Sequence, residues 1–177
     1  AADAESFDRI TAALAHWDDL DVHVRDRVIT SSGHGFSGIA RKKLLEILQG
    51  RCEEVGVTLR FQTEVRDEAG LGRHGLADAD VVIAADGVNS AWRAAHARHF
   101  APDLDTRTAK YIWLGTSLPL DAFTFYFVEN AHGVFQAHGY RFDADTSTFI
   151  VECDEASWRR AGFDRLDLPQ TVAACEA

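Results

Sequence analysis

An uninterrupted apolar run, VVIAA at residues 81–85, most constrains the fold of this chain, and it leads directly into the turn Asp86-Gly87. A run without polar alternation is typical of a strand that is covered on both faces, as in the central parallel sheet of an α/β domain. Residues 57–61 alternate strictly between apolar and polar side chains and predict a second strand. Few other parallel strands are visible, so we expect this sheet to need neighbouring strands from outside the chain.

Two helices are expected before these strands. Residues 37–55 form the clearer one, because a single apolar stripe recurs there at helical spacing. The stripe consists of Ile39, Leu44, Leu45, Leu48, Cys52 and Val55. Residues 6–17 predict the other helix, and short strands are expected around residues 22–24 and 28–29. Gly56 stands where the end of a helix favours a positive φ angle.

The character of the chain changes after Pro102, where β-rich segments dominate. The last three of these segments are joined by tight links and predict an antiparallel meander. The segments are 111–118, 123–129, 133–142 and 147–153. Short helices are expected at residues 90–98 and 155–162. We therefore assign the chain to the α/β class, with α+β character in this segment, and divide it into domains at 1–100 and 101–177.

The composition argues against several classes of function. The formal net charge of −10 argues against nucleic acid as a partner, because phosphate binding favours a basic surface. No apolar run approaches the roughly 20 residues that span a bilayer, so no membrane partner is expected. The eight histidines are scattered, and the three cysteines are widely spaced without a CxxC pair. This pattern predicts no metal site and a reducing, cytoplasmic location.

The chain contains no methionine and begins Ala1-Ala2. Methionine is an ordinary constituent of globular domains, so its absence from 177 residues is unusual. We expect that the sequence is a piece of a longer protein.

Two motifs occur together in a definite order. The first is I-x-R-x-x-L at residues 39–44, and the second is the apolar strand that ends in Asp86-Gly87. This pair resembles the aromatic hydroxylase family of flavoprotein monooxygenases, which is typified by p-hydroxybenzoate hydroxylase. Residues 33–41, 123–127 and 133–138 look like the subgroup that acts on aromatic acyl-CoA thioesters.

The resemblance implies part of a Rossmann-like FAD-binding domain in residues 1–100 and part of a substrate-binding sheet domain in residues 101–177, as in the p-hydroxybenzoate hydroxylase fold. It implies an enzyme that uses FAD, NAD(P)H and O₂ to hydroxylate a small aromatic substrate, in this subgroup an aromatic acyl-CoA. Two alternatives remain open. One is a flavoprotein of the same superfamily that does not hydroxylate, such as a reductase or a halogenase. The other is a non-catalytic ligand-binding module.

Four residues are candidate cofactor contacts: Arg41, Val65, Asp86 and Gly87. A guanidinium at Arg41 can bind a pyrophosphate bidentately, although an arginine on a helix is more often simply solvated. The Asp86-Gly87 turn would face the crevice where α/β sheets bind ligands, or it is a plain turn that caps the next helix. By resemblance, Asp86 helps to organise the flavin pyrophosphate region, and the backbone of Val65 meets the adenine side.

Aromatic side chains along the predicted meander are the candidate substrate contacts: Phe125, Phe127, His138 and Tyr140, with Phe135 beside them. Their alternation would present aromatic walls and polar tips to a flat ring. Ordinary sheet core is the alternative for the phenylalanines. No catalytic residue is assigned.

Two motifs of the family are missing from the sequence. One is the glycine-rich GxGxxG turn that opens such FAD-binding domains, and the other is a later Gly-Asp motif. Residues 70–75 fit the letters GxGxxG, but they follow an acidic loop and precede no predicted helix. We therefore expect this segment by itself not to retain FAD.

Overall fold

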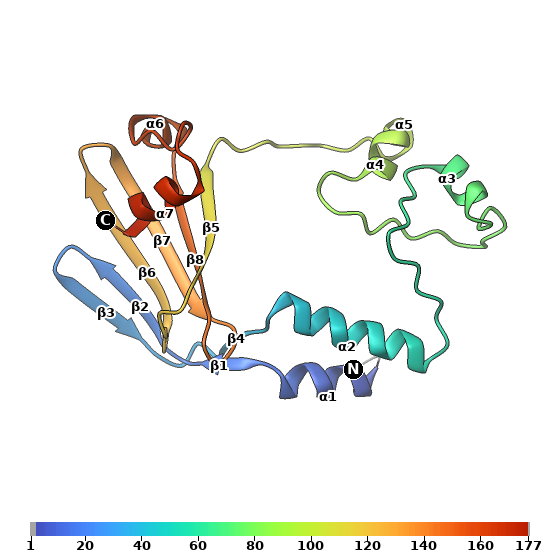
Figure 1. Cartoon of the computed structure of the whole chain (residues 1–177), viewed down its shortest axis with the longest axis horizontal. Helices are drawn as coiled ribbons and strands as arrows, with labels where there is room; N and C mark the ends of the chain where they lie inside the picture. Colours follow the sequence, from blue (N-terminus) through green and yellow to red (C-terminus); the bar gives the residue numbers. More distant parts are fainter. Residues whose placement is uncertain (1–2, 177) are drawn as a thin grey trace. The chain divides into compact units, whose positions relative to one another are not determined.

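The computed structural model describes residues 3–176, and its contacts divide the chain into two units (Figure 1). One unit consists of Ala1–Val57 and Arg107–Ala177, and the other is Thr58–Thr106. Of the early segments predicted as strands, those around residues 22–24 and 28–29 share a sheet with the C-terminal strands. The assignment of an FAD-binding domain and a substrate-binding domain stays a prediction.

The first unit is built on a six-stranded sheet with the strand order β3-β2-β6-β7-β8-β5. Its strands are β2 (Leu20–Val24), β3 (Arg27–Ser31), β5 (Lys110–Thr116), β6 (Phe123–Asn130), β7 (Gly133–Arg141) and β8 (Ser147–Cys153). All of its pairs are antiparallel except β2 with β6, which run parallel. The predicted meander β6-β7-β8 is therefore confirmed. A separate two-stranded sheet pairs β1 (Ala15–Trp17) with β4 (Phe36–Gly38).

One face of the large sheet carries the hydrophobic core. Phe135, Ala137 and Val151 are buried there together with Phe163. The helices α6 (Glu155–Arg160) and α7 (Leu168–Glu176) lie over this face, as Figure 1 shows. Asp154 begins α6 as its cap, because its carboxylate accepts hydrogen bonds from the backbone N–H groups of residues 156 and 157.

Helices α1 (Ala4–Ala12) and α2 (Arg41–Glu54) lie side by side in the same unit. Two ion pairs join them: Arg9 to Glu54 at 2.7 Å and Arg51 to Asp3 at 3.0 Å. Both helices were predicted, but each is shorter than expected. The predicted 6–17 helix ends at Ala12, and residues 15–17 instead pair with β4 as an extended strand.

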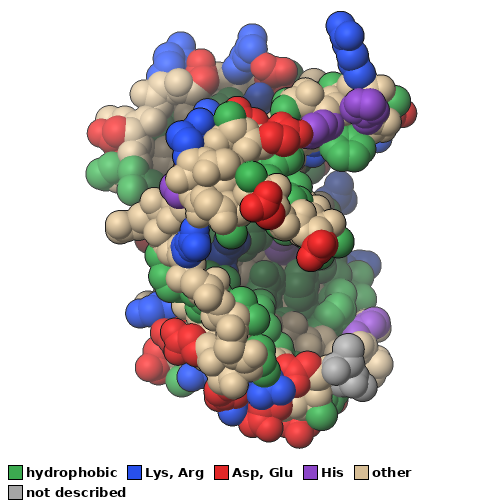
Figure 2. All heavy atoms as spheres, turned by 90° about the vertical axis from the view of Figure 1, so that its right-hand side faces the viewer, with side chains coloured by type: hydrophobic (Ala, Val, Ile, Leu, Met, Phe, Trp, Pro, Cys, Tyr) green, Lys and Arg blue, Asp and Glu red, His purple; other side chains and the backbone are tan. Residues whose placement is uncertain are grey.

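The second unit is mostly irregular, and here two strand predictions were wrong. It contains the short helices α3 (Glu68–Arg73), α4 (Ala91–Ala95) and α5 (Ala97–Phe100). Residues 57–61 and 81–85 form no strand, and Val81 and Ile83 are 75% and 85% exposed. A strand covered on both faces needs neighbouring strands to take up its backbone hydrogen bonds, and no described strand pairs with this segment. On the face drawn in Figure 2, hydrophobic side chains accordingly lie open among the charged ones.

The described helices include none that is both long and apolar enough to cross a bilayer. The three cysteines are all free thiols. The predicted cytoplasmic location stays a prediction.

Candidate functional site

An aromatic cluster occupies the face of the large sheet opposite α6 and α7. We call it the ring cluster, and it consists of Trp17, Phe36, Phe123, Phe125, His138 and Tyr140. Its centre is Phe123, whose ring centroid lies 5.0 Å from that of Phe125, 5.2 Å from that of Tyr140 and 5.9 Å from that of His138. All six side chains are only partly buried. The cluster is therefore a surface of stacked rings against which another flat group can lie.

The register of β6 and β7 brings these rings to one face. Phe125 pairs directly with His138, and side chains two residues further along a strand return to the same face. Phe127 continues the row at 6.4 Å from Phe125. All four of the predicted substrate contacts are thus on this face. Phe135 is not: it lies in the core beneath α6, because it is an odd number of positions from His138.

Sequence reasoning missed three members of the ring cluster: Trp17, Phe36 and Phe123. Trp17 was assigned to the end of a helix, but it reaches the cluster from β1 and stacks on Tyr140 at 5.7 Å. Phe36 lies on the paired strand β4, with its ring centroid 5.4 Å from that of Phe123. Phe123 could have been found from sequence, since it precedes Phe125 and Phe127 with the same alternation.

Two polar atoms of the ring cluster are buried without a hydrogen-bond partner. They are Trp17 Nε1 and His138 Nδ1, and no other described side-chain atom is in this state. Buried polar groups in folded proteins are almost always paired, and an unpaired one costs about 1–3 kcal/mol. The protein alone therefore leaves the hydrogen-bonding capacity of this cluster unfilled.

In the second unit, the Asp86-Gly87 turn is held by the start of α4. Asp86 Oδ2 accepts hydrogen bonds from Ala91 N at 2.8 Å and Trp92 N at 3.4 Å. The Ser90 hydroxyl, followed by these backbone N–H groups, holds the pKa of Asp86 below its usual range, although partial desolvation opposes them. The Asp86 carboxylate is thus used to hold the turn. Gly87 has φ +84°, and no atom lies within 4 Å of where a Cβ would be, so its backbone is open to close approach.

The same unit brings Val65 to this turn. Trp92, on α4, donates its indole N–H to Val65 O at 3.0 Å. Trp92 also stacks on His96, which contacts Glu68 at 2.7 Å. Gly87, Trp92 and His96 border an open hollow of about 800 Å³. Three of the four predicted cofactor contacts therefore lie together in the second unit, whereas Arg41 belongs to the first.

Arg41 is the first residue of α2, and the charges around it are unusual for the start of a helix. The first turn of this helix contains Arg41, Lys42 and Lys43 and no acidic residue, and Ala40 provides no side-chain cap. Cations are unfavourable at the N-terminus of a helix, where the backbone N–H groups favour an anion. Arg41 is exposed and has no ion-pair partner among the described residues. The arrangement is suited to an anion that pairs with both the side chains and the free N–H groups.

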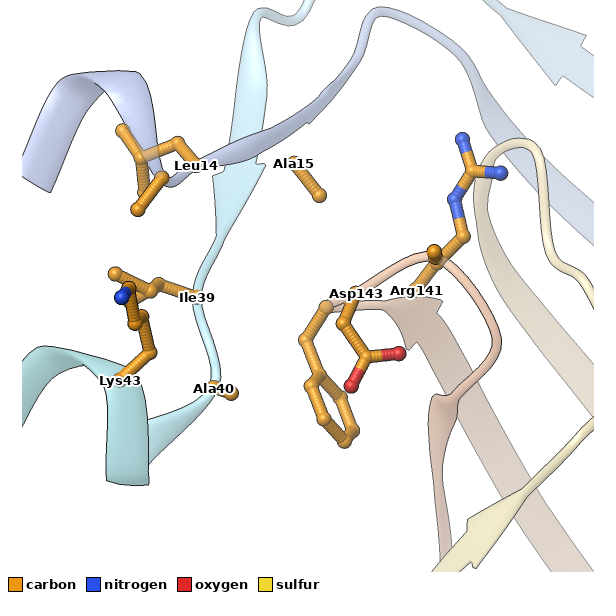
Figure 3. A pocket seen from close by; sticks show the side chains of 10 residues that line it. Leu14, Ala15, Ile39, Ala40, Lys43, Arg141 and Asp143 are labelled. Atoms are coloured by element: carbon orange, nitrogen blue, oxygen red, sulfur yellow. The ribbon is translucent and has the colours of Figure 1, made fainter.

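A hollow of about 420 Å³ lies beside this helix start. Figure 3 shows Leu14, Ile39 and Lys43 along one side of it and Arg141 and Asp143 along the other. The Asp143 carboxylate is partly used by its own loop, since it accepts a hydrogen bond from the backbone N–H of residue 145 at 3.1 Å. Among the described residues, no group of three or more metal-ligating side chains occurs here or elsewhere.

No family model matches the chain, but its sequence is similar to those of known monooxygenases. The chain is 44% identical over 152 residues to salicyloyl-CoA 5-hydroxylase of a Streptomyces species. It is 35% identical to protodeoxyviolaceinate monooxygenase of Chromobacterium violaceum over 141 residues, and 35% identical to 3-hydroxy-4-methyl-anthranilyl-[aryl-carrier protein] 5-monooxygenase of Streptosporangium sibiricum over 159 residues. These homologues support an aromatic hydroxylase family for the chain, which matches only a part of each of them.

The aligned regions cover most of this chain, 86%, 79% and 88% of it in the order given above. They span only 28%, 36% and 42% of the relatives' own lengths. The family predicted from the two motifs is confirmed, as is the mixed α/β fold class with its antiparallel-rich sheet.

Proposed function

We propose that the protein containing this chain is a flavin-dependent monooxygenase that hydroxylates an aromatic ring held as an acyl thioester, with NAD(P)H and O₂ as co-substrates. The observation that carries this proposal is the ring cluster, a stack of six partly exposed rings on one face of the sheet. A flat substrate ring is held there by dispersion and ring-to-ring contact and by removal of its apolar surface from water. FAD, when bound, supplies the activation of oxygen.

The substrate class is supported by two of the relatives' names. One names an aryl-CoA, and another names an aryl group on a carrier protein. Both describe aromatic acyl thioesters, so we propose a thioester of this kind as the substrate. The four side chains Phe125, Phe127, His138 and Tyr140 are proposed to contact its ring.

The proposed cofactor contacts are Arg41, Val65, Asp86 and Gly87. Arg41 is proposed to pair with the pyrophosphate of FAD, because a cationic and uncapped helix start favours an anion. In the other unit, the open backbone of Gly87 fits the close approach of a phosphate chain, with Asp86 keeping the turn in place. The carbonyl of Val65 already accepts a hydrogen bond from Trp92, so its proposed contact to adenine falls to the rest of its backbone.

The test is made on the protein encoded by the complete reading frame. It should copurify with flavin and oxidise NAD(P)H faster when an aromatic acyl-CoA is present. Labelled O₂ should place one labelled oxygen atom on the ring, as measured by mass spectrometry. Oxidation of NAD(P)H that yields only hydrogen peroxide with every aromatic acyl-CoA tried would contradict the proposal.

The role of Arg41 has its own control in the same turn. Arg41→Ala removes a bidentate, charge-assisted contact, and we expect flavin affinity to fall by about 10–100-fold. Lys42→Ala removes an equal charge without the bidentate geometry and should lower the affinity much less. Equal losses in the two variants would assign the effect to charge alone.

A further inference from the structure

Trp92 is a shared neighbour of Val65 and the Asp86-Gly87 turn, although these lie about twenty residues apart in the sequence. The backbone N–H of Trp92 donates to Asp86 Oδ2 at 3.4 Å, and its indole N–H donates to Val65 O at 3.0 Å. All of these residues belong to the second unit, Thr58–Thr106. A single residue of α4 therefore connects the turn to the segment that contains Val65.

The segment around Val65 has little else to fix its backbone. Residues 63–66 belong to no helix or strand. In the part of the chain that the structure describes, they make no backbone–backbone hydrogen bond. The bond from the Trp92 indole therefore sets the direction of the Val65 carbonyl. Because a trans peptide is planar, the same bond also orients the N–H of that peptide, which points away from the indole.

The Trp92 side chain is itself held in place by neighbouring groups. Its ring stacks on that of His96, with centroids 5.7 Å apart and planes inclined by 10°. His96 Nε2 in turn lies 2.7 Å from Glu68 Oε1 on α3. The Ser90 hydroxyl caps α4 by accepting a hydrogen bond from the backbone N–H of residue 93. The indole N–H is thus directed at Val65 before any ligand is bound.

We propose that Trp92 is a positioning residue for the cofactor, which orders the Val65 backbone that meets the adenine side. This rests on the proposed function and adds a residue that acts through Val65 rather than through its own contact with FAD. A contact that is ordered in advance strengthens binding, because the ligand need not immobilise the segment itself. The effect should be confined to the adenine side of the cofactor.

Flavin binding to the complete protein, after removal of its flavin, tests this without turnover. Trp92→Phe keeps a ring against His96 and the backbone N–H to Asp86, and it removes the indole donor. We expect the affinity for FAD to fall by about 5–10-fold, the effect of one neutral hydrogen bond. The affinity for FMN, which lacks the adenosine half, should stay the same. Equal losses for the two flavins, or an unchanged affinity for FAD, would overturn the proposal.

The matched control is Trp113→Phe. The indole N–H of Trp113 also donates within the protein, to Thr148 Oγ1 in the large sheet of the first unit. This variant removes the same kind of donor outside the second unit, and it should bind FAD as the wild type does. A loss of FAD affinity as large as that in Trp92→Phe would contradict a specific role for Trp92.

A second measurement does not depend on flavin. In the flavin-free protein, NMR relaxation should give lower order parameters for residues 64–66 in Trp92→Phe than in the wild type, whereas those of α4 should stay the same. Unchanged order parameters at residues 64–66 would refute the link between Trp92 and Val65.

Failure of this proposal differs in its outcome from failure of the proposed function. A complete protein that hydroxylates aryl thioesters and binds FAD equally well as Trp92→Phe retains the function and loses the role of Trp92. A complete wild-type protein that binds no flavin contradicts the proposed function, and the relaxation measurement still decides whether Trp92 orders Val65.

Discussion

Gly133 is a position where a single methyl group should matter. Its φ is +136°, and a Cβ there would lie 2.0 Å from Ser157 Oγ and 2.9 Å from Arg160 Nη2. Ser157 is fully buried and held by the Asp154 cap of α6. We predict that Gly133→Ala lowers the free energy of unfolding by about 2–4 kcal/mol, because it adds a steric clash to backbone strain. Denaturant titration measures this change.

The control for this prediction is Gly115→Ala, also in a strand of the large sheet. A Cβ at Gly115 meets no atom within 4 Å, and its φ is not in the left-handed region. This variant should change the free energy of unfolding by less than about 1 kcal/mol. Equal stability of the two variants would mean that the β6–β7 turn does not pack closely against α6.

The lowered pKa of Asp86 leads to a prediction about pH. The Ser90 hydroxyl and the backbone N–H groups at the start of α4 stabilise its carboxylate and lower its pKa in the folded state. A lowered pKa contributes stability that is complete above about pH 4, the ordinary range of aspartate, and is lost as the pH falls through the folded value. We predict that the amide resonances of Ala91 and Trp92 titrate with a midpoint below that of a free aspartate, as followed by NMR.

Two comparisons check the Asp86 titration. In Asp86→Asn the low-pH titration of these amides should vanish while α4 remains, because one side-chain oxygen can still accept. A titration midpoint at or above pH 4 in the wild-type chain would show that the turn does not hold the ionised carboxylate.

At the scale of elements, the packing of α1 against α2 is supported by ion pairs between the two helices. Arg51 contacts Asp3, and Arg9 contacts Glu54, with all four side chains at least 30% exposed. The arginines lower the pKa of Glu54, and Ser6 followed by Arg51 lowers that of Asp3. Because both carboxyl pKa values are lowered, the contribution to stability is present above about pH 4–5 and is lost at lower pH.

We predict that the unfolding temperature, followed by circular dichroism, is level near neutral pH and falls below about pH 4. Arg51→Gln should reduce this acid dependence and should also reduce the sensitivity to salt, because exposed ion pairs are screened. Lys43→Gln is the matched control, since its contact with Glu46 is long, at 3.9 Å, and lies outside the pair of ion pairs between the helices. Equal acid and salt responses in the two variants would show that the ion pairs between α1 and α2 do not cause this dependence.

The same scale shows what could be predicted from sequence and why the rest could not. The meander was predictable, because β6, β7 and β8 are neighbours in sequence and each β-turn link is short. The parallel pairing of β2 with β6 was not, because nothing local in Leu20–Val24 specifies a partner roughly a hundred residues away. The VVIAA run has the composition of a covered strand but no strand beside it, so its composition alone could not produce one.

The candidate site followed the same division. Alternation along β6 and β7 was enough to place Phe125, Phe127, His138 and Tyr140 on one face. It did not exclude Phe135, although Phe135 is three residues from His138 on β7. Side chains an odd number of positions apart lie on opposite faces of a strand, and Phe135 is in the core. Trp17 entered the ring cluster through the pairing of β1 with β4, a contact between distant positions that periodicity does not report.

At the scale of the whole molecule, the two units should differ in their protection from solvent. Thr58–Thr106 contains three short helices and no strand, and Val81, Ile83 and Val88 are all more than 70% exposed. We predict that amides of residues 77–90 exchange with deuterium much faster than those of β7 and β8, whose ladders are hydrogen-bonded on both sides. Mass spectrometry of peptic fragments measures both regions in one sample. Comparable protection in the two regions would contradict the description of the second unit.

The parallel pairing of β2 with β6 has a consequence for how this sheet tolerates change. In the sequence, the second unit, Thr58–Thr106, lies between two parts of the first unit, in the manner of an insertion. Each doubling of such a connection costs only about 0.6 kcal/mol in closure entropy. The enclosed segment is thus free to grow or diverge without disturbing the ladder, while β2 and β3 can dock only after the long connection has closed. We therefore expect the meander to form early in folding and β2 and β3 to join the sheet later.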